Sequence, residues 1–370
     1  MKKLLCFVTL LLLLASPALG EGLPVLYLDA SQLDYVRTRP GTLTAGDAVL
    51  PVAVKYRGTY SFTFTGKRNY SLHLKNPAGK SQKVSLLGLR EDDDYVLLGG
   101  LSDSSRLRNP VGLALWRSLG YPAPRSAPCE LVFSGYYKGI YFLFERPDRK
   151  SAGVPDYGAL YRVLAAGADG LDVLTAPPGE EPRGDEWYNV GREYGGWAPL
   201  TALSRREAAL NRAAFADYYL FINLIGASDN MTKNLYLCWD GEAFYPMPWD
   251  LDAAFGRLYT AEPSDPACWY SGPLLDRLLA EEDFDALLRA RWAALRDRLA
   301  PEAVMAMFNA AYDRLDEAGA WDREAERFPA YTDSVTGVTH PLDPKAELAF
   351  IREYLTARFA LVDAAYGGNP

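Results

Sequence analysis

Two short acidic segments hold the residues best suited to chemistry. The first, residues 227–234, contains Asp229 and Asn234 and directly follows an apolar stretch. The second, residues 248–256, contains Asp250 and Asp252 and ends in Phe-Gly. Both segments place carboxylates beside large hydrophobic residues. Such acids are costly to bury unless they are paired or bound to a metal.

Phosphoryl transfer is one reaction that needs this set of residue types. It requires Mg²⁺ held by oxygen ligands and a carboxylate that places the attacking hydroxyl. Asn234 with Asp250 or Asp252 could hold the metal, and Asp229 could orient the nucleophile. The spacing of Asp229 and Asn234 can arise by chance, but the order of a helix, D-x4-N, a hairpin and an acidic turn ending in Phe-Gly is that of protein kinases. The alternative is that Asp229 caps a turn and Asp250 pairs with an arginine.

Charged residues in the N-terminal half could serve the same site. Lys67 precedes a strand and could contact nucleotide phosphates, although lysines at strand edges are more often simply exposed. Glu145 ends an apolar strand and could either pair with such a lysine or face solvent. Arg106 and Arg108 stand at the start of a predicted helix, where the macrodipole disfavours cations, so we expect them to face an anion or an acidic partner. Residues 92–94, all Asp, predict a solvated loop, with a bound divalent ion as the alternative.

The elements that must position these residues change in type along the chain. Alternating or β-branched and aromatic runs in the first half predict strands at residues 26–28, 52–56, 60–64, 70–74 and 95–98, and a hairpin at 130–133 and 139–144. Ser104 or Ser105 predicts the start of a helix that ends at Leu119.

The second half is mostly helical. Ser204 with Glu207 resembles a capping box and predicts a helix to Ile225. Residues 234–238 and 244–247 predict a small two-stranded insert joined through Asp240-Gly241. Further helices are predicted at residues 272–280, 283–299, 301–319 and 344–364.

These elements predict the α+β class. We expect a β-rich lobe at residues 21–150, an irregular Gly- and Pro-rich segment at 151–203, and a helical lobe with the acidic segments at 204–370. Clefts between such lobes are common ligand sites.

Composition narrows the classes of function. The 370 residues hold 39 Lys and Arg against 47 Asp and Glu, which argues against a general nucleic-acid binder. The N-terminus predicts a signal peptide at residues 1–20, because Lys2 and Lys3 are followed by an eleven-residue apolar run and a small-residue cleavage site at 18–20. We therefore expect a secreted or envelope-associated protein without a stable membrane span. With His73 and His340 as the only histidines, a His/Cys zinc site is not expected.

The sequence resembles the CotH kinase family, which is named for a spore-coat protein. The resemblance lies, in order along the chain, in Arg57-Gly58, residues 67–72, 86–90, 95–98 and 105–109, Gly139-Ile140-Tyr141 with Glu145, Asp229 with Asn234-Leu235-Tyr236, and residues 248–256. The chain departs from the usual kinase signatures, since it has no G-x-G-x-x-G loop before Lys67 and no His-Arg before Asp229.

The resemblance implies an atypical secreted or coat-associated protein kinase with a diverged bilobal fold. Such an enzyme uses ATP and Mg²⁺ or Mn²⁺ to phosphorylate Ser or Thr of coat or cell-surface proteins. The resemblance implies that Lys67, Glu145 and Arg108 lie at the nucleotide, with Glu145 supporting Lys67. It implies that Asp229 acts in catalysis or binds metal, and that Asn234, Asp250 and Asp252 hold the metal.

Two other classes of function remain open. Export and an aromatic content of 13% suit a non-catalytic surface or coat protein on a kinase-like scaffold. A carboxylate pair such as Asp229 and Asp250 could serve a glycoside hydrolase, although acids two residues apart are more typical of metal binding.

Overall fold

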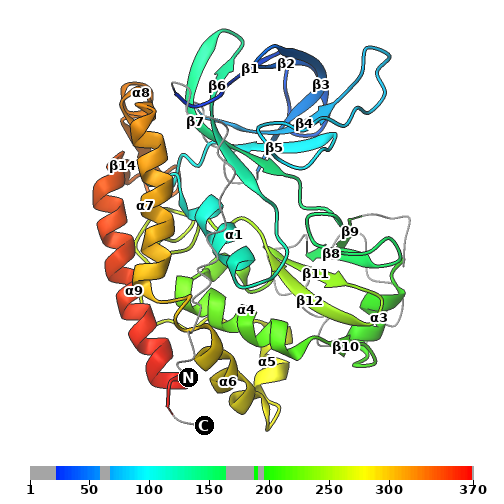
Figure 1. Ribbon diagram of the computed structural model, residues 1–370, viewed down its shortest axis with the longest axis vertical. Coiled ribbons are helices and arrows are strands. Elements are labelled where there is room, and N and C mark those ends of the chain that lie inside the picture. The colour runs from blue at the N-terminus through cyan, green and yellow to red at the C-terminus, as the bar shows by residue number, and fades with distance from the viewer. Residues whose placement is uncertain (1–21, 59–66, 164–186, 191–195, 369–370) are drawn as a thin grey trace, which may run out of the picture.

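The computed structural model describes residues 22–58, 67–163, 187–190 and 196–368 (Figure 1). The predicted signal peptide at 1–20 and the predicted strand at 60–64 lie outside these ranges. The described chain contains helices and strands, which confirms the α+β class. In Figure 1 the N-terminal strands gather at the top, with a second sheet and most of the helices below them.

The N-terminal strands close into a barrel in the order β1-β2-β3-β4-β5-β7-β6. Their bounds are β1 (Val25–Ala30), β2 (Arg39–Ala45), β3 (Ala48–Arg57), β4 (Asn69–Leu74), β5 (Asp94–Leu98), β6 (Ser126–Phe133) and β7 (Tyr136–Glu145). Alternation explains β4, where Tyr70, Leu72 and Leu74 are buried and the residues between them are half-buried. The described strands that the sequence predicted in this half are thereby confirmed.

Helix α1 (Arg108–Ser118) follows β5 and begins later than Ser104 or Ser105, which the sequence predicted as its start. Arg106 has a φ of +57°, a left-handed conformation that a helix cannot contain. The Asp103 carboxylate instead accepts the backbone N–H groups of Ser105 and Arg108. The residues before α1 therefore form a tight turn.

The second sheet has the order β10-β12-β11-β8-β9. Its bounds are β8 (Ala159–Val163), β9 (Trp187–Asn189), β10 (Ala209–Leu210), β11 (Leu235–Trp239) and β12 (Ala243–Pro248). The β11–β12 hairpin confirms both predicted strands, but it is part of a five-stranded sheet rather than the small two-stranded insert that the sequence predicted. Strand β8, from the segment predicted to be irregular, pairs with β11, and β10 pairs with β12.

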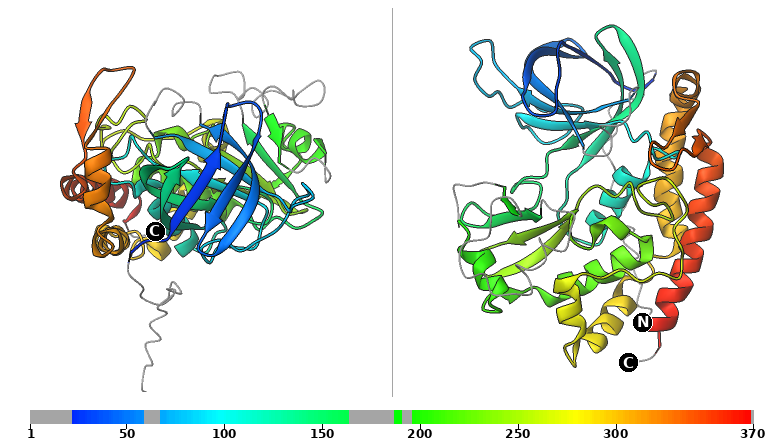
Figure 2. Two further views of the ribbon diagram at one scale, coloured as in Figure 1. Left: turned by 90° about the horizontal axis from the view of Figure 1, so that it is seen from above. Right: turned by 180° about the vertical axis from the view of Figure 1, so that it is seen from behind.

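The helices of the second half are α3 (Ala198–Ser204), α4 (Arg212–Ile225), α5 (Pro273–Leu279), α6 (Phe284–Leu295), α7 (Pro301–Glu317), α8 (Ala320–Arg327) and α9 (Pro344–Tyr366), with the strands β13 (Ala330–Thr332) and β14 (Thr339–Pro341). Ser204 ends α3 and does not cap α4, so the predicted capping box is wrong. Asn211 caps α4, because its side-chain oxygen accepts the N–H of Ala214. Figures 1 and 2 show α7 and α9 side by side along one flank.

Two apolar cores hold the molecule together. One fills the barrel. The other contains the outward-facing Val96 of β5 and Phe144 of β7 together with Trp116 of α1 and residues of α4 to α9. The outer face of β5 and β7 is thus packed against α1 and the helical part. This packing fixes the position of the barrel relative to the acidic segments. Within the described residues, we find no helix both long and apolar enough to cross a membrane.

Candidate active site

The β11–β12 hairpin brings the two acidic segments together. Leu235 pairs with Pro248 at its open end. One residue further out, the N–H of Trp249 donates to the carbonyl of Asn234 over 2.9 Å. Asp229 lies on the chain that enters this end, and Asp250 lies on the chain that leaves it.

Hydrogen bonds from two asparagine side chains hold the two acidic segments together. The Asn234 amide donates to Asp229 Oδ2 at 3.2 Å and to the Asp250 carbonyl at 3.5 Å. The fully buried Asn230 amide donates to the carbonyls of Asn234 and Trp249 at 3.2 and 2.8 Å. The structure thus brings Asp229, Asn234 and Asp250 to one place.

Helix α4 delivers Asp229 to this place. The helix ends at Gly226, which has a φ of +65°. A Cβ atom there would lie 2.0 Å from the Tyr354 hydroxyl oxygen, so both the turn and the close packing require glycine. The chain then enters the short helix η2 (Ser228–Asn230), which carries Asp229.

The acidic turn (residues 248–256), which begins at the end of β12, is held in place by contacts with α1. Asp250 has a φ of +58°, a strained conformation for a residue other than glycine. The N–H of Leu251 donates to Asn109 Oδ1 at 3.2 Å, and Arg108 Nε donates to the carbonyl of Ala254 at 2.9 Å. Strain that neighbours hold in place is common at functional sites.

The resemblance implies that Arg108 lies at the nucleotide, but the structure places its side chain in a buried cluster of charges. Its side chain has no exposed surface, and its guanidinium binds the carboxylates of Asp103 and Glu347. The expectation of an acidic partner is confirmed, whereas a nucleotide has no access to Arg108 in this structure. Burial raises the pKa of Glu347, but the attraction of Arg108 and Arg257 outweighs burial and lowers this pKa to about 2. Arg108 and Glu347 are therefore both charged at neutral pH, and Arg108 connects them to the turn.

The acids of the site repel one another. Burial raises the pKa of Asp252 well above its usual value, and the charges of Asp250, Asp229 and Asp103 raise it further. Burial also raises the pKa of Asp250, where the attraction of Arg57 opposes the repulsion of Asp229. A site of this kind favours a bound cation.

The donor set fits a divalent metal that arrives with other ligands. Asp250, Asp252 and Asn234 offer the oxygen donors that Mg²⁺ and Mn²⁺ prefer. Within the described ranges, no group of three or more His, Cys, Asp or Glu side chains is arranged to hold a metal by itself. Mg²⁺ is commonly held by one or two carboxylates plus substrate phosphates, so the acid turn matches that mode of binding.

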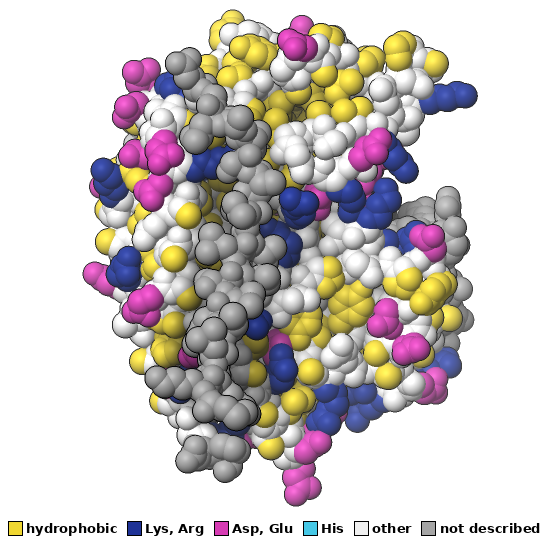
Figure 3. Space-filling view, viewed as in Figure 1, with side chains coloured by type: hydrophobic (Ala, Val, Ile, Leu, Met, Phe, Trp, Pro, Cys, Tyr) yellow, Lys and Arg dark blue, Asp and Glu magenta, His cyan; other side chains and the backbone are white. Residues whose placement is uncertain are grey.

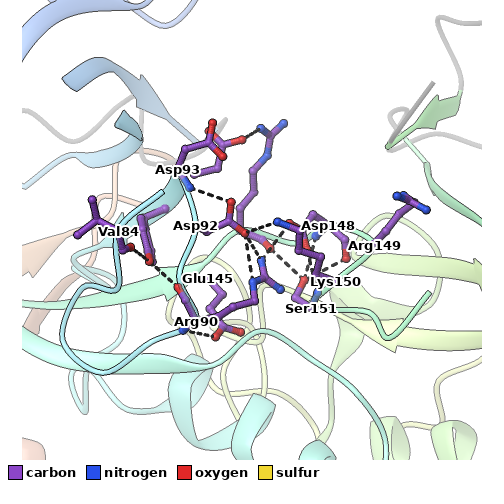
Figure 4. Close-up of polar contacts among 12 residues, drawn as sticks. Val84, Arg90, Asp92, Asp93, Glu145, Asp148, Arg149, Lys150 and Ser151 are labelled. Atoms are coloured by element: carbon purple, nitrogen blue, oxygen red, sulfur yellow. Dashed lines mark hydrogen bonds and ion pairs between the residues drawn. The ribbon is translucent and has the colours of Figure 1, made fainter. Parts of the chain in front are cut away.

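Glu145 neither pairs with Lys67 nor faces solvent, so both alternatives expected for it are wrong. The Glu145 carboxylate accepts the backbone N–H of Arg90 at 3.1 Å (Figure 4) and the backbone N–H of Arg125 at 3.0 Å. It thereby joins the end of β7 to the loops that precede β5 and β6.

The partner of Lys67 is Glu324 of α8, which the sequence reasoning missed. Lys67 Nζ lies 2.5 Å from Glu324 Oε1, and both side chains are fully buried. Arg106 Nε donates to the same oxygen at 2.9 Å, and the N–H of Ile140 donates to Oε2 at 2.7 Å. This Lys67–Glu324–Arg106 cluster joins the barrel to the C-terminal part. That Lys67 contacts a nucleotide stays a prediction.

The three successive aspartates are not a solvated loop. Asp92 is 3% exposed and binds Arg90 at 2.7 Å and Lys150 at 3.4 Å (Figure 4). Arg90 also binds Asp148 at 3.0 Å, on the connector between β7 and β8. Arg90 and Lys150 therefore neutralise Asp92, and the contacts tie the connector to the barrel.

Comparison with known proteins assigns the family. The CotH kinase protein family matches residues 54–178 and 202–361, well over half of the chain. The chain belongs to the CotH kinase protein family. The match covers the acidic turn, Asp229 and Asn234, as well as Lys67 and Glu324. No match was found among the curated proteins.

Two solved structures show weak similarity. The proinflammatory kinase CtkA of Helicobacter pylori is 10% identical, with a TM-score of 0.32, over 80% of this chain and 93% of that one. The HipA–HipB toxin–antitoxin complex with operator DNA from Shewanella oneidensis MR-1 gives 14% identity and a TM-score of 0.27, over 84% of this chain and 66% of the matched one. Both TM-scores are too low to establish the fold.

Proposed function

We propose that this member of the CotH kinase family is a secreted, metal-dependent protein kinase with a diverged bilobal fold. It transfers the γ-phosphate of ATP to Ser or Thr of coat or cell-surface proteins. One observation carries the proposal: Asp229, Asn234 and Asp250 meet at the open end of one hairpin, and Asp252 follows two residues after Asp250.

Each of these residues has a distinct task in the reaction. Asp250, Asp252 and Asn234 would hold the divalent metal, which offsets the charge of the phosphates during transfer. Asp229 would orient the acceptor hydroxyl and take its proton as the oxygen bonds to phosphorus and ADP leaves. Lys233 Nζ lies 4.0 Å from Asp229 Oδ2 and adds positive charge beside this step.

The fold supplies a rigid frame for these tasks. Asn230 and Asn234 fix the two acidic segments to each other, and Asn109 with Arg108 fixes the acidic turn to α1. Positioning of this kind supplies much of the catalysis in phosphoryl transfer, because the protein performs little covalent chemistry. The predicted signal peptide and the resemblance to a spore-coat family support a coat or cell-surface acceptor.

The proposal is tested by incubating residues 21–370 with γ-labelled ATP, Mg²⁺ or Mn²⁺, and casein as a generic acceptor. Asp229→Asn and Asp252→Asn should each lower labelling by about 10²-fold or more. Asp156→Asn serves as the matched control, because the Asp156 side chain is 93% exposed on the connector. Equal labelling by all four proteins would refute the proposed site. No labelling by a folded wild-type chain would favour the non-catalytic surface protein.

A further inference from the structure

Two arginines lie over aromatic rings beside the acidic segments, and they come from different parts of the fold. Arg57 is the last residue of β3 in the barrel, and its guanidinium lies 5.6 Å from the centre of the Trp249 ring. Trp249 immediately precedes Asp250. Arg162 belongs to β8 of the second sheet, pairs in register with Tyr236, and lies 5.9 Å from the centre of that ring.

The positive charges in this region repel one another. Burial lowers the pKa of Arg57, Asp250 opposes that effect, and the charges of Arg162 and Arg146 lower the pKa further. Figure 3 shows Lys and Arg side chains gathered at the waist between the barrel and the part below it. Guanidinium groups held together in this way favour a bound anion with several negative charges.

Arg162 also has a donor without an acceptor. Its Nε atom is buried and has no hydrogen-bond partner within the part of the chain that the structure describes. A buried N–H without an acceptor costs free energy that a ligand oxygen would recover.

The cations of the Lys67–Glu324–Arg106 cluster, unlike Arg162 Nε, already have an acceptor. There the Glu324 carboxylate already binds both cations, and Lys67 is fully buried. Arg57 lies over Trp249, which immediately precedes Asp250, and Arg162 lies over Tyr236, which is two residues from Asn234, so both arginines lie close to the proposed metal ligands. A phosphate chain beside the metal would thus meet Arg57 and Arg162.

We propose that Arg57 and Arg162 bind the phosphate groups of a nucleoside di- or triphosphate whose metal is held at the acidic turn. This inference rests on the proposed function. Arg57 contributes a guanidinium from the barrel side and Arg162 one from the second sheet, so the phosphates lie between the two parts of the molecule. Planar guanidinium groups suit this task, because each presents several N–H donors to phosphate oxygens.

The test measures binding rather than turnover. Calorimetric titrations of residues 21–370 with ATP, ADP and adenosine, in the presence of Mg²⁺, compare wild type with Arg57→Gln and Arg162→Gln. Each variant should bind ATP and ADP about tenfold to a hundredfold more weakly, since each loses a charged hydrogen bond to phosphate. Adenosine, which has no phosphate, should bind all three proteins equally.

Two further variants sharpen the comparison. Arg289→Gln removes one positive charge from α6, where Arg289 pairs with Asp285 on the surface, and should leave all affinities unchanged. Arg57→Lys keeps the charge without the planar group and should bind ATP with an affinity between wild type and Arg57→Gln. Circular dichroism verifies that each variant is folded, and Arg162→Gln decides the question if Arg57→Gln does not fold.

The outcomes separate the inference from the proposed function. Wild-type affinity for ATP in folded Arg57→Gln and Arg162→Gln would overturn the inference and leave the kinase proposal standing. An equal loss of adenosine affinity would overturn it too, because the arginines would then act on the fold rather than on phosphate. Failure of the wild type to bind ATP with either metal would overturn the proposed function and the inference together.

Discussion

Replacing Glu324 by glutamine should destabilise the whole protein, because this carboxylate joins elements that are far apart in the chain. Glu324 lies 257 residues from Lys67 in sequence, yet their charged atoms are 2.5 Å apart. The same carboxylate binds Arg106 and accepts the N–H of Ile140. Glutamine has nearly the same volume and can still accept one hydrogen bond, so the substitution removes charge rather than packing.

The expected loss of stability follows from the two positive charges that remain buried in the variant. In Glu324→Gln, Lys67 and Arg106 stay in place with side-chain exposures of 0% and 3% and without the charge that neutralised them. Removing one partner of a buried ion pair costs about 3–5 kcal/mol. Since domains are stable by roughly 5–15 kcal/mol, we expect a large loss of folding free energy.

Urea denaturation at pH 7, followed by circular dichroism, measures this loss. Glu326→Gln is the matched control, because Glu326 is exposed on the same helix and should change stability by less than about 0.5 kcal/mol. Adding Lys67→Met to Glu324→Gln should recover part of the stability, since one of the two unneutralised cations is then absent. Equal unfolding midpoints for Glu324→Gln and Glu326→Gln would refute the reasoning.

Two further predictions concern stability. The pKa of Glu347 falls from 4.5 to about 2 on folding, so its contribution of ~3 kcal/mol is present above pH 4.5 and is lost as the pH falls toward 2. The stability difference between wild type and Glu347→Gln, from urea unfolding at several pH values, should therefore shrink over that range; a constant difference would contradict this. Gly139→Ala should cost about 2 kcal/mol or more beyond Gly46→Ala, because both positions have a positive φ but only at Gly139 would the Cβ atom lie 1.9 Å from Glu324 Oε2. Equal thermal unfolding of these two glycine variants would contradict the close approach.

The sequence predicted the parts of the site that depend on local order. Asp229, Asn234, Asp250 and Asp252 lie within one helix–hairpin–turn unit, so finding the hairpin was enough to bring the two acidic segments together. The strands on either side of Asp240-Gly241 carry clear alternation and turn signals, and the structure confirms both.

The parts that depend on distant contacts were missed or misassigned. Nothing near Lys67 indicates Glu324, and α8 lay in a gap between two predicted helices. A signal was nevertheless present: Ala320, Trp321 and Glu324 share the buried face of α8, so an acid stands where the helical period places apolar residues. The resemblance implied that Glu145 supports Lys67, whereas the Glu145 carboxylate accepts two backbone N–H groups.

Arg57 and Arg162 illustrate the same limit. Each lies within an ordinary strand, and the placement of Arg57 beside Trp249 and of Arg162 beside Tyr236 depends on contacts between segments distant in sequence. Strand β8 was itself hidden in a segment rich in Gly and Pro, so its pairing with β11 could not be read from local pattern.

The central claim is that the acidic turn holds a divalent metal together with a nucleotide. Equilibrium dialysis of residues 21–370 against radioactive Mn²⁺, with equal ATP on both sides of the membrane, measures this directly. We predict that the wild type and the exposed-site control Asp156→Asn retain Mn²⁺ in an ATP-dependent way, and that Asp252→Asn loses this binding. Equal ATP-dependent retention of Mn²⁺ by folded Asp252→Asn and wild type would contradict the account.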